Sequence, residues 1–268
     1  MSWSLLALPL GLIIGISLGA LGGGGSILTV PALVYAIGES PGHATTASLI
    51  IVGITALTGT VGHARGGRVR WGPGLVFGIV GVGGSLLGSH LNRLINPNVL
   101  LLAFGGLMLV AAAAMVQRQR SMQAAAVRPG GRDQAGQRLG PRRVLAVAVA
   151  GTVVGFMTGF FGVGGGFVVV PALVLALGFA MGDAVGTSLL IIAINTVAAL
   201  AARVGSASID WSVVVPFTLA AMFGSLLGNR IAGTVPPSTL TRAFAALLVL
   251  LALYVATRSL LALTVTGT

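Results

Sequence analysis

The stretch GGGGSILTVPALV, from Gly22 to Val34, returns 140 positions later as GVGGGFVVVPALV, from Gly162 to Val174. In each copy a cluster of glycines is followed, after a few apolar residues, by Val-Pro-Ala-Leu-Val. Glycine frees the backbone and proline removes a hydrogen-bond donor, so both copies are expected to interrupt the helix that contains them. This twin interruption decides how the chain is organised.

The correspondence continues beyond this stretch without a gap. Trp71 aligns with Trp211, the run Gly84 to Gly88 with Gly224 to Gly228, and Pro97 with Pro237. Shared apolar composition would not keep proline and tryptophan pairs in one register over about a hundred residues. We therefore interpret the chain as two tandem repeats, 1–117 and 144–268, joined by an arginine-rich linker over 118–143.

Composition indicates that lipid surrounds both repeats. Of the 268 residues, 56% are hydrophobic and only 7% are charged, and the mean hydropathy is +1.04. Soluble domains carry about a quarter charged residues. Several apolar runs approach the roughly 20 residues that a helix needs to cross hydrocarbon. The predicted fold class is all-α, in a polytopic membrane protein with the lipid bilayer as its partner.

The formal net charge of +11 is concentrated in the short loop with Arg65, Arg68 and Arg70 and in the linker. The positive-inside rule places both in the cytoplasm, which predicts a multi-pass protein of the cell (inner) membrane. No aromatic residues are interleaved with these arginines, so nucleic acid is not an expected partner. The first twenty residues lack Lys and Arg, which predicts that no signal peptide is removed.

Each repeat contains four apolar segments, which cover 4–37, 44–63, 73–91 and 98–116, and then 144–178, 184–202, 212–231 and 239–258. Segments two to four have spanning length. The first is too long for one helix, and we predict two short helices joined by an unwound glycine turn. An even number of crossings by this pair makes the repeats inverted, and an odd number makes them parallel. The use of broken helices in other transporters favours inverted repeats.

The glycine turns are the sharpest candidate for a binding site. A break leaves unpaired N–H groups and a partial positive charge at the start of the next helix, where an anion can be held. The alternative is close helix packing through small residues, which needs no ligand. Because the clusters are twinned and each precedes a proline, we favour a binding site formed by Gly22, Gly24, Gly25, Ser26, Gly162, Gly164, Gly165 and Gly166.

Hydroxyl groups open the second segment of each repeat, at Thr46 and Ser48 and at Thr187 and Ser188. They could cap the free N–H groups of a helix start, donate hydrogen bonds to an anion in the glycine turn, or do both. Asn195 lies deeper in the same segment, where an amide in hydrocarbon must find a partner. We predict that Asn195 lines the pathway, with hydrogen bonding between helices as the alternative.

Titratable residues are scarce and lie near segment ends, where His43 aligns with Asp183 and His63 with Arg203. Residues near ends usually reach the membrane interface. The alternative is that they face the pathway and attract an anion or relay a proton. With four acidic residues and no cysteine, the chain has no paired carboxylates and no cluster typical of a metal site. We therefore predict no enzyme, no catalytic residue, no metal and no cofactor.

Other shared positions predict packing and anchoring. Small residues recur every four positions in the Gly84–Gly88 run and in its twin, which is the spacing of close helix contact. Trp71 and Trp211 precede the third segments and are expected at the membrane interfaces.

Together these residues resemble the sulfite exporter TauE/SafE family. The resemblance rests on the paired glycine clusters leading to Val30-Pro31-Ala32-Leu33 and Val170-Pro171-Ala172-Leu173. It also rests on Thr46-Ala47-Ser48-Leu49 and Gly186-Thr187-Ser188-Leu189, which look like the family's Ala-Thr-Ser-Leu start of the following helix. The resemblance covers nearly the whole chain outside the linker. It implies a secondary transporter, usually an exporter, of a small anionic substrate such as sulfite or a sulfonate.

The resulting hypothesis is an alternating-access carrier whose two glycine turns face each other near the membrane midplane. Backbone N–H groups and neighbouring hydroxyls would hold an oxyanion there. The first repeat reads Thr46-Ala47-Ser48 where the second has Thr187-Ser188, so we expect unequal contributions from the two halves. The alternatives are a channel for ions or small solutes and a membrane scaffold subunit. The sequence predicts no particular oligomeric state.

Overall fold

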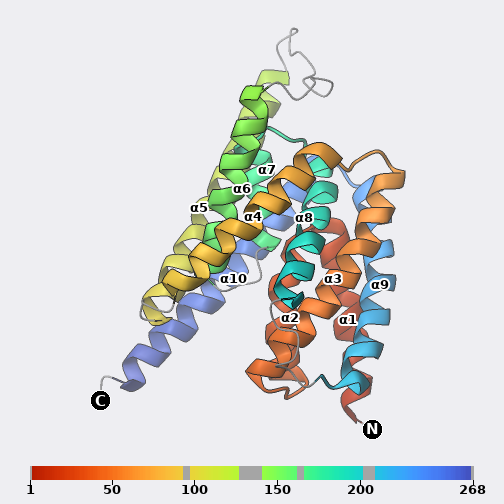
Figure 1. Ribbon diagram of the computed structural model, residues 1–268, viewed down its shortest axis with the longest axis vertical. Helices are drawn as coiled ribbons and strands as arrows, with labels where there is room; N and C mark the ends of the chain where they lie inside the picture. Colours follow the sequence, from red (N-terminus) through yellow and green to blue (C-terminus); the bar gives the residue numbers. More distant parts are fainter. Residues whose placement is uncertain (1, 93–96, 127–140, 162–165, 202–208, 267–268) are drawn as a thin grey trace.

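The structure, a computed structural model, describes residues 2–92, 97–126, 141–161, 166–201 and 209–266. These ranges are helical apart from short connections and contain no strand, which confirms the all-α fold class (Figure 1). In chain order the helices are α1 (Ser2–Leu21), α2 (Gly24–Pro31), a π-helical turn (Ala32–Ala36), α3 (Pro41–Arg65), α4 (Trp71–Asn92), α5 (Pro97–Ala126), α6 (Pro141–Phe161), α7 (Gly166–Leu175), α8 (Met181–Ala201), α9 (Trp211–Thr234) and α10 (Pro237–Thr266).

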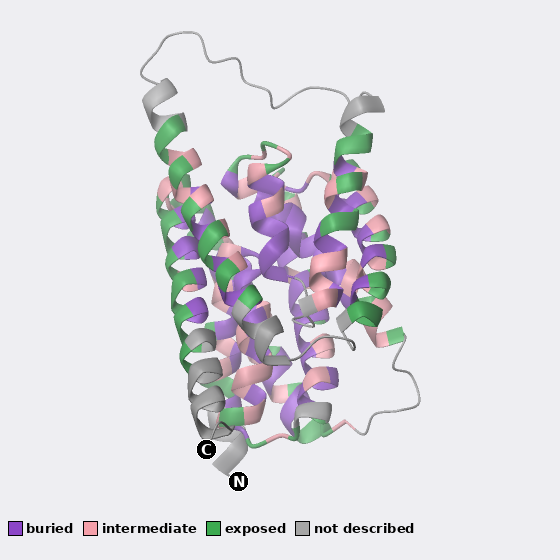
Figure 2. Cartoon of the chain, turned by 90° about the vertical axis from the view of Figure 1, so that its left-hand side faces the viewer, coloured by how far each residue is buried: buried purple, intermediate pink, exposed green. Residues whose placement is uncertain are grey.

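Apolar helices long enough to cross a membrane account for much of the described chain. Five such spans cover His43–Arg65, Trp71–Leu91, Met181–Ala201, Trp211–Thr234 and Pro237–Tyr254. Their outward faces carry large apolar side chains, among them Ile79, Leu87, Leu219 and Leu250, each more than 60% exposed. Figure 2 shows buried residues gathered inside the bundle and exposed ones on its outer helices. Hydrocarbon, and not water, solvates such a surface favourably.

The first segment of the first repeat consists of two helices joined by a glycine turn, as the sequence predicts. α1 ends at Leu21 and α2 begins at Gly24. Between them, Gly22 has a φ of +72°, which L side chains rarely adopt. The chain folds back here, because a Cβ on Gly25 would lie 2.7 Å from the backbone nitrogen of Leu18.

The first segment of the second repeat also contains two helices. α6 ends at Phe161 and α7 begins at Gly166. The intervening residues 162–165 lie outside the described residues. The unwound turn predicted for this cluster therefore falls outside the described residues, and α6, with 21 residues, is longer than the short helix predicted.

Glycines allow the long helices to pack in two close pairs. α1 packs along α9, and α4 packs along α6. Gly15 of α1 lies against the backbone of Ala221 in α9, and Gly84 of α4 lies against the backbone of Thr152 in α6. A side chain at either glycine would collide with the facing helix. The packing role predicted for the Gly84–Gly88 run is therefore confirmed, and each pair joins helices of different repeats.

Equivalent helices of the two repeats run in opposite directions. α3 and α8 are counterparts in the repeat and pack antiparallel, because Gly53 faces Thr196 and Gly59 faces Leu189. α1 and α9 run with α3, whereas α4 and α6 run with α8 (Figure 1). Inverted repeats require this arrangement, and their orientation in a bilayer stays a prediction.

One end of the bundle gathers arginines from both repeats. The loop between α3 and α4 lies beside the start of α8 and the end of α9, because the Arg68 side chain reaches Gly182 and Gly233. The end of α5 joins this group, since Arg118 donates a hydrogen bond of 2.8 Å to the carbonyl oxygen of Leu175 at the end of α7. We call this the arginine-rich end. α5 continues to Ala126 and α6 starts at Pro141, so helices extend into the predicted linker from both sides.

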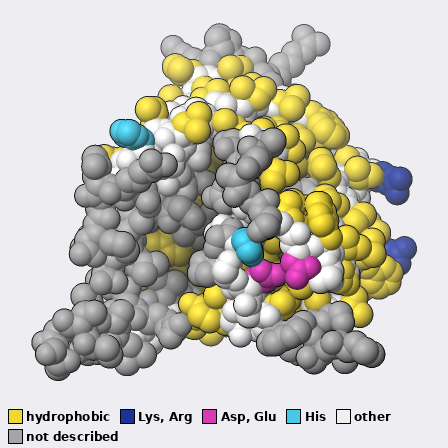
Figure 3. All heavy atoms as spheres, turned by 60° about the horizontal axis from the view of Figure 1, so that its bottom comes forward, with side chains coloured by type: hydrophobic (Ala, Val, Ile, Leu, Met, Phe, Trp, Pro, Cys, Tyr) yellow, Lys and Arg dark blue, Asp and Glu magenta, His cyan; other side chains and the backbone are white. Residues whose placement is uncertain are grey.

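The opposite end carries acidic and histidine side chains among apolar ones (Figure 3). There Glu39 lies 3.8 Å from His43. Asp210 caps α9, and hydrogen bonds from the side chain and backbone of Ser212 hold the pKa of the Asp210 carboxyl below its usual value. Trp71 and Trp211, both more than half exposed, begin α4 and α9 from opposite ends of the bundle. This placement suits aromatic anchors at the two interfaces of a membrane.

Candidate functional site

The first glycine turn meets the start of α7 inside the bundle. The backbone of Gly23, just before α2, contacts that of Gly166, the first residue of α7, and a Cβ on Gly166 would lie 3.0 Å from the carbonyl oxygen of Gly23. The Ser26 hydroxyl donates a 2.7 Å hydrogen bond to the same carbonyl. The structure therefore brings together Ser26, Gly166 and the first turn, as predicted. Gly162, Gly164 and Gly165 lie outside the described residues.

Ser188 of the second repeat lies against the turn of the first. A Cβ on Gly22 would contact the Ser188 hydroxyl and would lie 3.0 Å from a methyl group of Val170. The Ser188 hydroxyl is fully buried and donates a 2.8 Å hydrogen bond to the carbonyl oxygen of Val185, one turn earlier in α8. Its oxygen keeps the capacity to accept, and rotation of its O–H would let it donate elsewhere.

The two serines near the start of the second segments, Ser48 and Ser188, do not act as helix caps. α3 and α8 begin at Pro41 and Met181, earlier than the apolar pattern suggested. Ser40 caps α3 by accepting a hydrogen bond from the His43 N–H. Ser48, like Ser188, lies within its helix and donates to a carbonyl three residues back, at 2.8 Å from the oxygen of Thr45. The capping interpretation is therefore wrong for both serines.

The two threonines of the candidate site are also buried. The Thr187 hydroxyl, in α8, accepts a 3.0 Å hydrogen bond from the backbone N–H of Arg70. It thereby ties the start of α8 to the loop between α3 and α4. Thr46 is 4% exposed in the second turn of α3.

Asn195 lies away from the first glycine turn. It follows Ser188 by seven residues in α8, roughly 10 Å along the helix axis. Its side-chain oxygen lies near Gly81 of α4 and has no hydrogen-bond partner among the described residues. A polar group buried without a partner is costly, so Asn195 keeps hydrogen-bonding capacity between α4 and α8.

His63 is fully buried near the end of α3, so the interface interpretation is wrong for this residue. Its Nε2 lies 2.8 Å from the carbonyl oxygen of Gly19, three residues before the glycine turn. The helix places it inside the bundle because α1, α8 and α9 all pack around the last turns of α3. Its sequence counterpart, Arg203, lies outside the described residues.

Asp183 forms an ion pair that the sequence did not predict. The Arg70 guanidinium donates two hydrogen bonds to one carboxylate oxygen of Asp183, at 2.9 and 2.7 Å. This pair joins the α3–α4 loop to the start of α8, at the arginine-rich end. His43, which aligns with Asp183 in the repeat, lies at the other end of the bundle beside Glu39. The interface placement therefore suits both residues.

Two further polar residues line the same region. The Ser225 hydroxyl of α9 lies 3.4 Å from the carbonyl oxygen of Thr55, and the Asn229 amide lies against Gly62 of α3. The sequence signal was a serine and an asparagine on one apolar helix, four residues apart, but nothing in it indicated which helix they face. Among the described residues no group of three His, Cys, Asp or Glu side chains could hold a metal ion.

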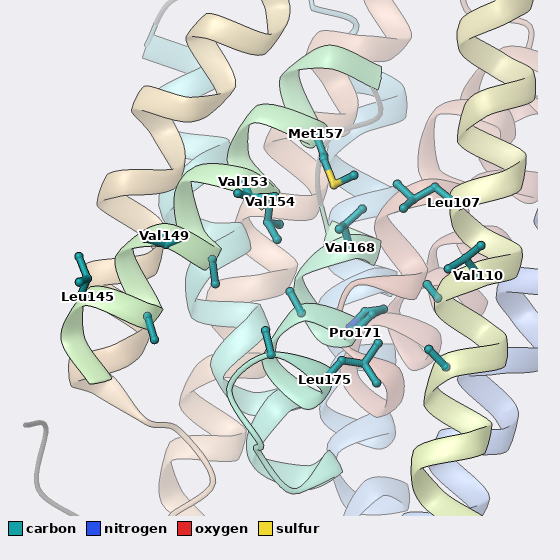
Figure 4. Close-up of a pocket in the computed structure, with 16 residues that line it drawn as sticks. Leu107, Val110, Leu145, Val149, Val153, Val154, Met157, Val168, Pro171 and Leu175 are labelled. Carbon is teal, nitrogen blue, oxygen red and sulfur yellow. The ribbon is translucent and has the colours of Figure 1, made fainter. Parts of the chain in front are cut away.

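The first turn is closed to solvent in this conformation, because Gly22 to Gly25 are all buried. A cavity of about 690 Å³ lies elsewhere, between α5, α6 and α7 (Figure 4). Apolar side chains line it, including Leu107, Val149, Val168 and Pro171, and none of the predicted substrate contacts does. Such a lining does not suit an anion. An anion therefore reaches the first turn only after packed helices move apart.

Comparisons with known proteins agree with a membrane transporter. A family model described as sulfite exporter TauE/SafE matches residues 7–255. A "Probable membrane transporter protein" of Xylella fastidiosa (strain 9a5c) is 33% identical over 254 residues, covering 92% of this chain and 92% of that protein. "Probable membrane transporter protein YunE" of Bacillus subtilis (strain 168) is 29% identical over 234 residues, covering 83% and 86%. No solved structure matches.

Proposed function

We propose that this chain, which belongs to the sulfite exporter TauE/SafE family, is a secondary transporter that exports a small sulfur oxyanion across the cell (inner) membrane. Membership of a family of membrane transporters and the five apolar spans support the transport role. Sulfite or an organosulfonate is the substrate class that we assign, and alternating access is the mechanism that we assign.

The observation that carries the proposal is the meeting of two helix starts at the glycine turns. α2 begins at Gly24 and α7 begins at Gly166, and the backbone of Gly23 contacts the backbone of Gly166. Each helix start carries about half a positive charge, so two like partial charges face each other among apolar helices. An anion between them removes this repulsion and accepts hydrogen bonds from N–H groups that the helices leave unpaired.

The side chains around the turns can supplement these donors without adding a full charge. Ser188 already touches Gly22 across the interface between repeats. Thr46, Ser48 and Thr187 lie in the second turns of α3 and α8. Neutral donors bind an oxyanion without the trapping that a buried arginine would cause, which suits a carrier that must release its substrate.

Alternating access follows from how the helices pair. Because the first turn is buried, substrate entry requires a movement. In the internal repeat α1 corresponds to α6 and α9 corresponds to α4, so the pair α1–α9 corresponds to the pair α4–α6. Glycine contacts hold each pair together. Rocking one pair against the other would open the glycine turns first to one face and then to the other.

The arginine-rich end supports the orientation. We place it, together with the linker 118–143, in the cytoplasm by the positive-inside rule. A negative-inside potential then favours outward movement of an anion by roughly 2.3 kcal/mol per charge per 100 mV. This makes export the downhill direction for an uncoupled anion.

Counterflow in liposomes tests the function. Purified protein is reconstituted with unlabelled sulfite or methanesulfonate inside, and labelled solute is added outside. A carrier concentrates label transiently against the unlabelled pool, and the initial rate saturates with concentration. A channel gives flux without counterflow, and a scaffold subunit gives no flux. Absence of exchange for both probes would rule out the proposed function.

A matched pair of variants tests the site. A Cβ on Gly24 would lie 2.6 Å from a methyl group of Leu247, whereas a Cβ on Gly106 of α5 meets nothing within 4 Å. We expect Gly24→Leu to abolish counterflow and Gly106→Leu to preserve it, with both proteins folded by size-exclusion chromatography. Unchanged transport by folded Gly24→Leu would remove the glycine turn from the binding site, as would unchanged transport by Gly164→Leu for the second cluster.

A further inference from the structure

We infer that His63 is the proton-binding residue that couples anion transport to the proton gradient, so that one proton accompanies each monovalent anion. This inference rests on the proposed function and deepens it, because it names the ion that moves with the substrate. Proton and monovalent anion then cross together without net charge, so the coupled export is driven by the concentration gradients of anion and proton, and the membrane potential that favours an uncoupled anion does not contribute. It is carried by a fully buried imidazole with one ring nitrogen bonded and the other without a partner, next to the first glycine turn.

The position of the imidazole is fixed by two neighbouring helices. On one side its Nε2 lies 2.8 Å from the carbonyl oxygen of Gly19 in α1. On the other side α8 comes so close that a Cβ on Gly186 would lie 3.0 Å from the Cβ of His63. The ring is therefore held between the end of α1, which Gly22 follows directly, and the start of α8, which contains Ser188.

The hydrogen bond determines which nitrogen can take up a proton. A carbonyl oxygen can only accept, so Nε2 must carry a hydrogen and donate it to Gly19. In the neutral ring Nδ1 is then an acceptor, and it is buried with no hydrogen-bond partner among the described residues. A second proton would bind there, forming an N–H bond and giving imidazolium, and would leave from the same atom when that bond breaks.

The anion site is close enough to respond to this charge. Gly19 precedes Gly22 by three residues, roughly 4.5 Å along α1. A charge buried among apolar helices is costly unless a partner of opposite sign lies nearby. An oxyanion at the glycine turn supplies that partner, and a proton on His63 in turn favours the anion. The two ligands therefore bind better together than separately, as linkage requires.

No described carboxylate competes for this role. Among the elements packed around His63, α8 contributes Asp183, which is already paired with Arg70. The adjoining loop contributes Arg68, α3 its own Arg65 and α9 the exposed Arg230. α1 contains no charged residue. All four arginines would repel an imidazolium, which leaves the transported anion as the counter-charge.

Accumulation driven by a pH gradient tests the coupling. Liposomes containing the protein are given a pH difference of one unit while potassium and valinomycin hold the potential at zero, and labelled methanesulfonate is followed. This anion does not itself titrate near neutral pH. We expect the native protein to accumulate labelled methanesulfonate roughly tenfold on the alkaline side, because one pH unit corresponds to a factor of ten in proton concentration.

The diagnostic variant is His63→Gln, whose amide can still donate to the Gly19 carbonyl but cannot bind a proton at neutral pH. We expect it to exchange labelled for unlabelled methanesulfonate while losing accumulation driven by pH. His90→Gln, at an exposed histidine of α4, is the control that should retain both. Tenfold accumulation by His63→Gln would overturn the inference and leave the transporter intact. Loss of exchange by folded His63→Gln would also overturn it, because His63 would then serve anion binding and not coupling.

A measurement on the native protein covers the case in which the variant does not fold. When methanesulfonate is added to the protein in weakly buffered detergent solution, a pH indicator should report proton uptake approaching one per anion bound. Binding without proton uptake between pH 6 and 8 would overturn the inference. Failure of the native protein to exchange any probe would instead remove the proposed function, and the coupling with it.

Discussion

The substitution Gly22→Ala tests whether the first glycine turn is required for its close approach to Ser188 as well as for its backbone conformation. Gly67 shares that conformation among the described residues, because φ is +72° at Gly22 and +67° at Gly67. An L residue in this region costs about 1–2 kcal/mol at either position. At Gly67, in the α3–α4 loop, an added Cβ meets nothing within 4 Å. Gly67→Ala therefore measures the backbone cost alone.

At Gly22 the added methyl group has no free space. It would contact the Ser188 hydroxyl and would lie 3.0 Å from Val170 and 3.3 Å from the Cα of Val185. Overpacking of this kind costs about 1–3 kcal/mol. We therefore expect Gly22→Ala to be destabilised by about 2 kcal/mol more than Gly67→Ala. For a chain of this length that difference lowers Tm by roughly 4–8 °C.

Thermal unfolding in detergent, followed by intrinsic tryptophan fluorescence, provides the assay. The double variant Gly22→Ala/Ser188→Ala should recover part of the difference, since it removes one of the contacts. Equal Tm values for Gly22→Ala and Gly67→Ala would refute the close approach described for this turn. Full counterflow by Gly22→Ala, despite a lower Tm, would show that the turn matters for folding and not for substrate binding.

Two further predictions concern packing and the ion pair. Gly84→Ala should destabilise the protein by about 1–3 kcal/mol, because its Cβ meets the backbone of α6, whereas Gly83→Ala, which meets nothing within 4 Å, should leave Tm unchanged or raise it. Equal effects would argue against the α4–α6 contact. A double-mutant cycle with Asp183→Asn and Arg70→Gln should give a coupling free energy of about 1 kcal/mol that decreases in high salt, as for a partly exposed pair. Additive effects on unfolding would contradict the observed ion pair.

The sequence predicted the helices and the interruptions because both depend on local chemistry. Apolar runs bounded by Gly, Pro and Trp located the second to fourth segments, and the observed helices begin and end within a few residues of them, except where α5 extends to Ala126 and α10 to Thr266. The Gly22–Gly25 cluster interrupted its segment because a positive φ at Gly22 suits glycine alone.

Contacts between helices were not predicted, because apolar composition does not specify which faces meet. The glycine contacts of α1 with α9 required knowing that Gly15 faces the second repeat. The pairing of Arg70 with Asp183 joins residues far apart in sequence. The alignment of the two repeats related Asp183 to His43 and gave no indication of Arg70. His63 was expected to reach the interface from its place near a segment end, yet three helices converge on that end and bury it.

The exchange of helices between repeats has a consequence for how such a chain can originate. Among the described residues the glycine face of α1 packs on α9 and the matching face of α4 packs on α6, so each repeat finds the close partners of two of its helices in the other repeat. A half-length protein with this sequence would complete its packing only against a second copy inserted in the membrane the other way up. Joining both copies in one polypeptide fixes their opposite insertion and their stoichiometry, and then leaves each copy free to diverge, as His63 and Arg203 have done.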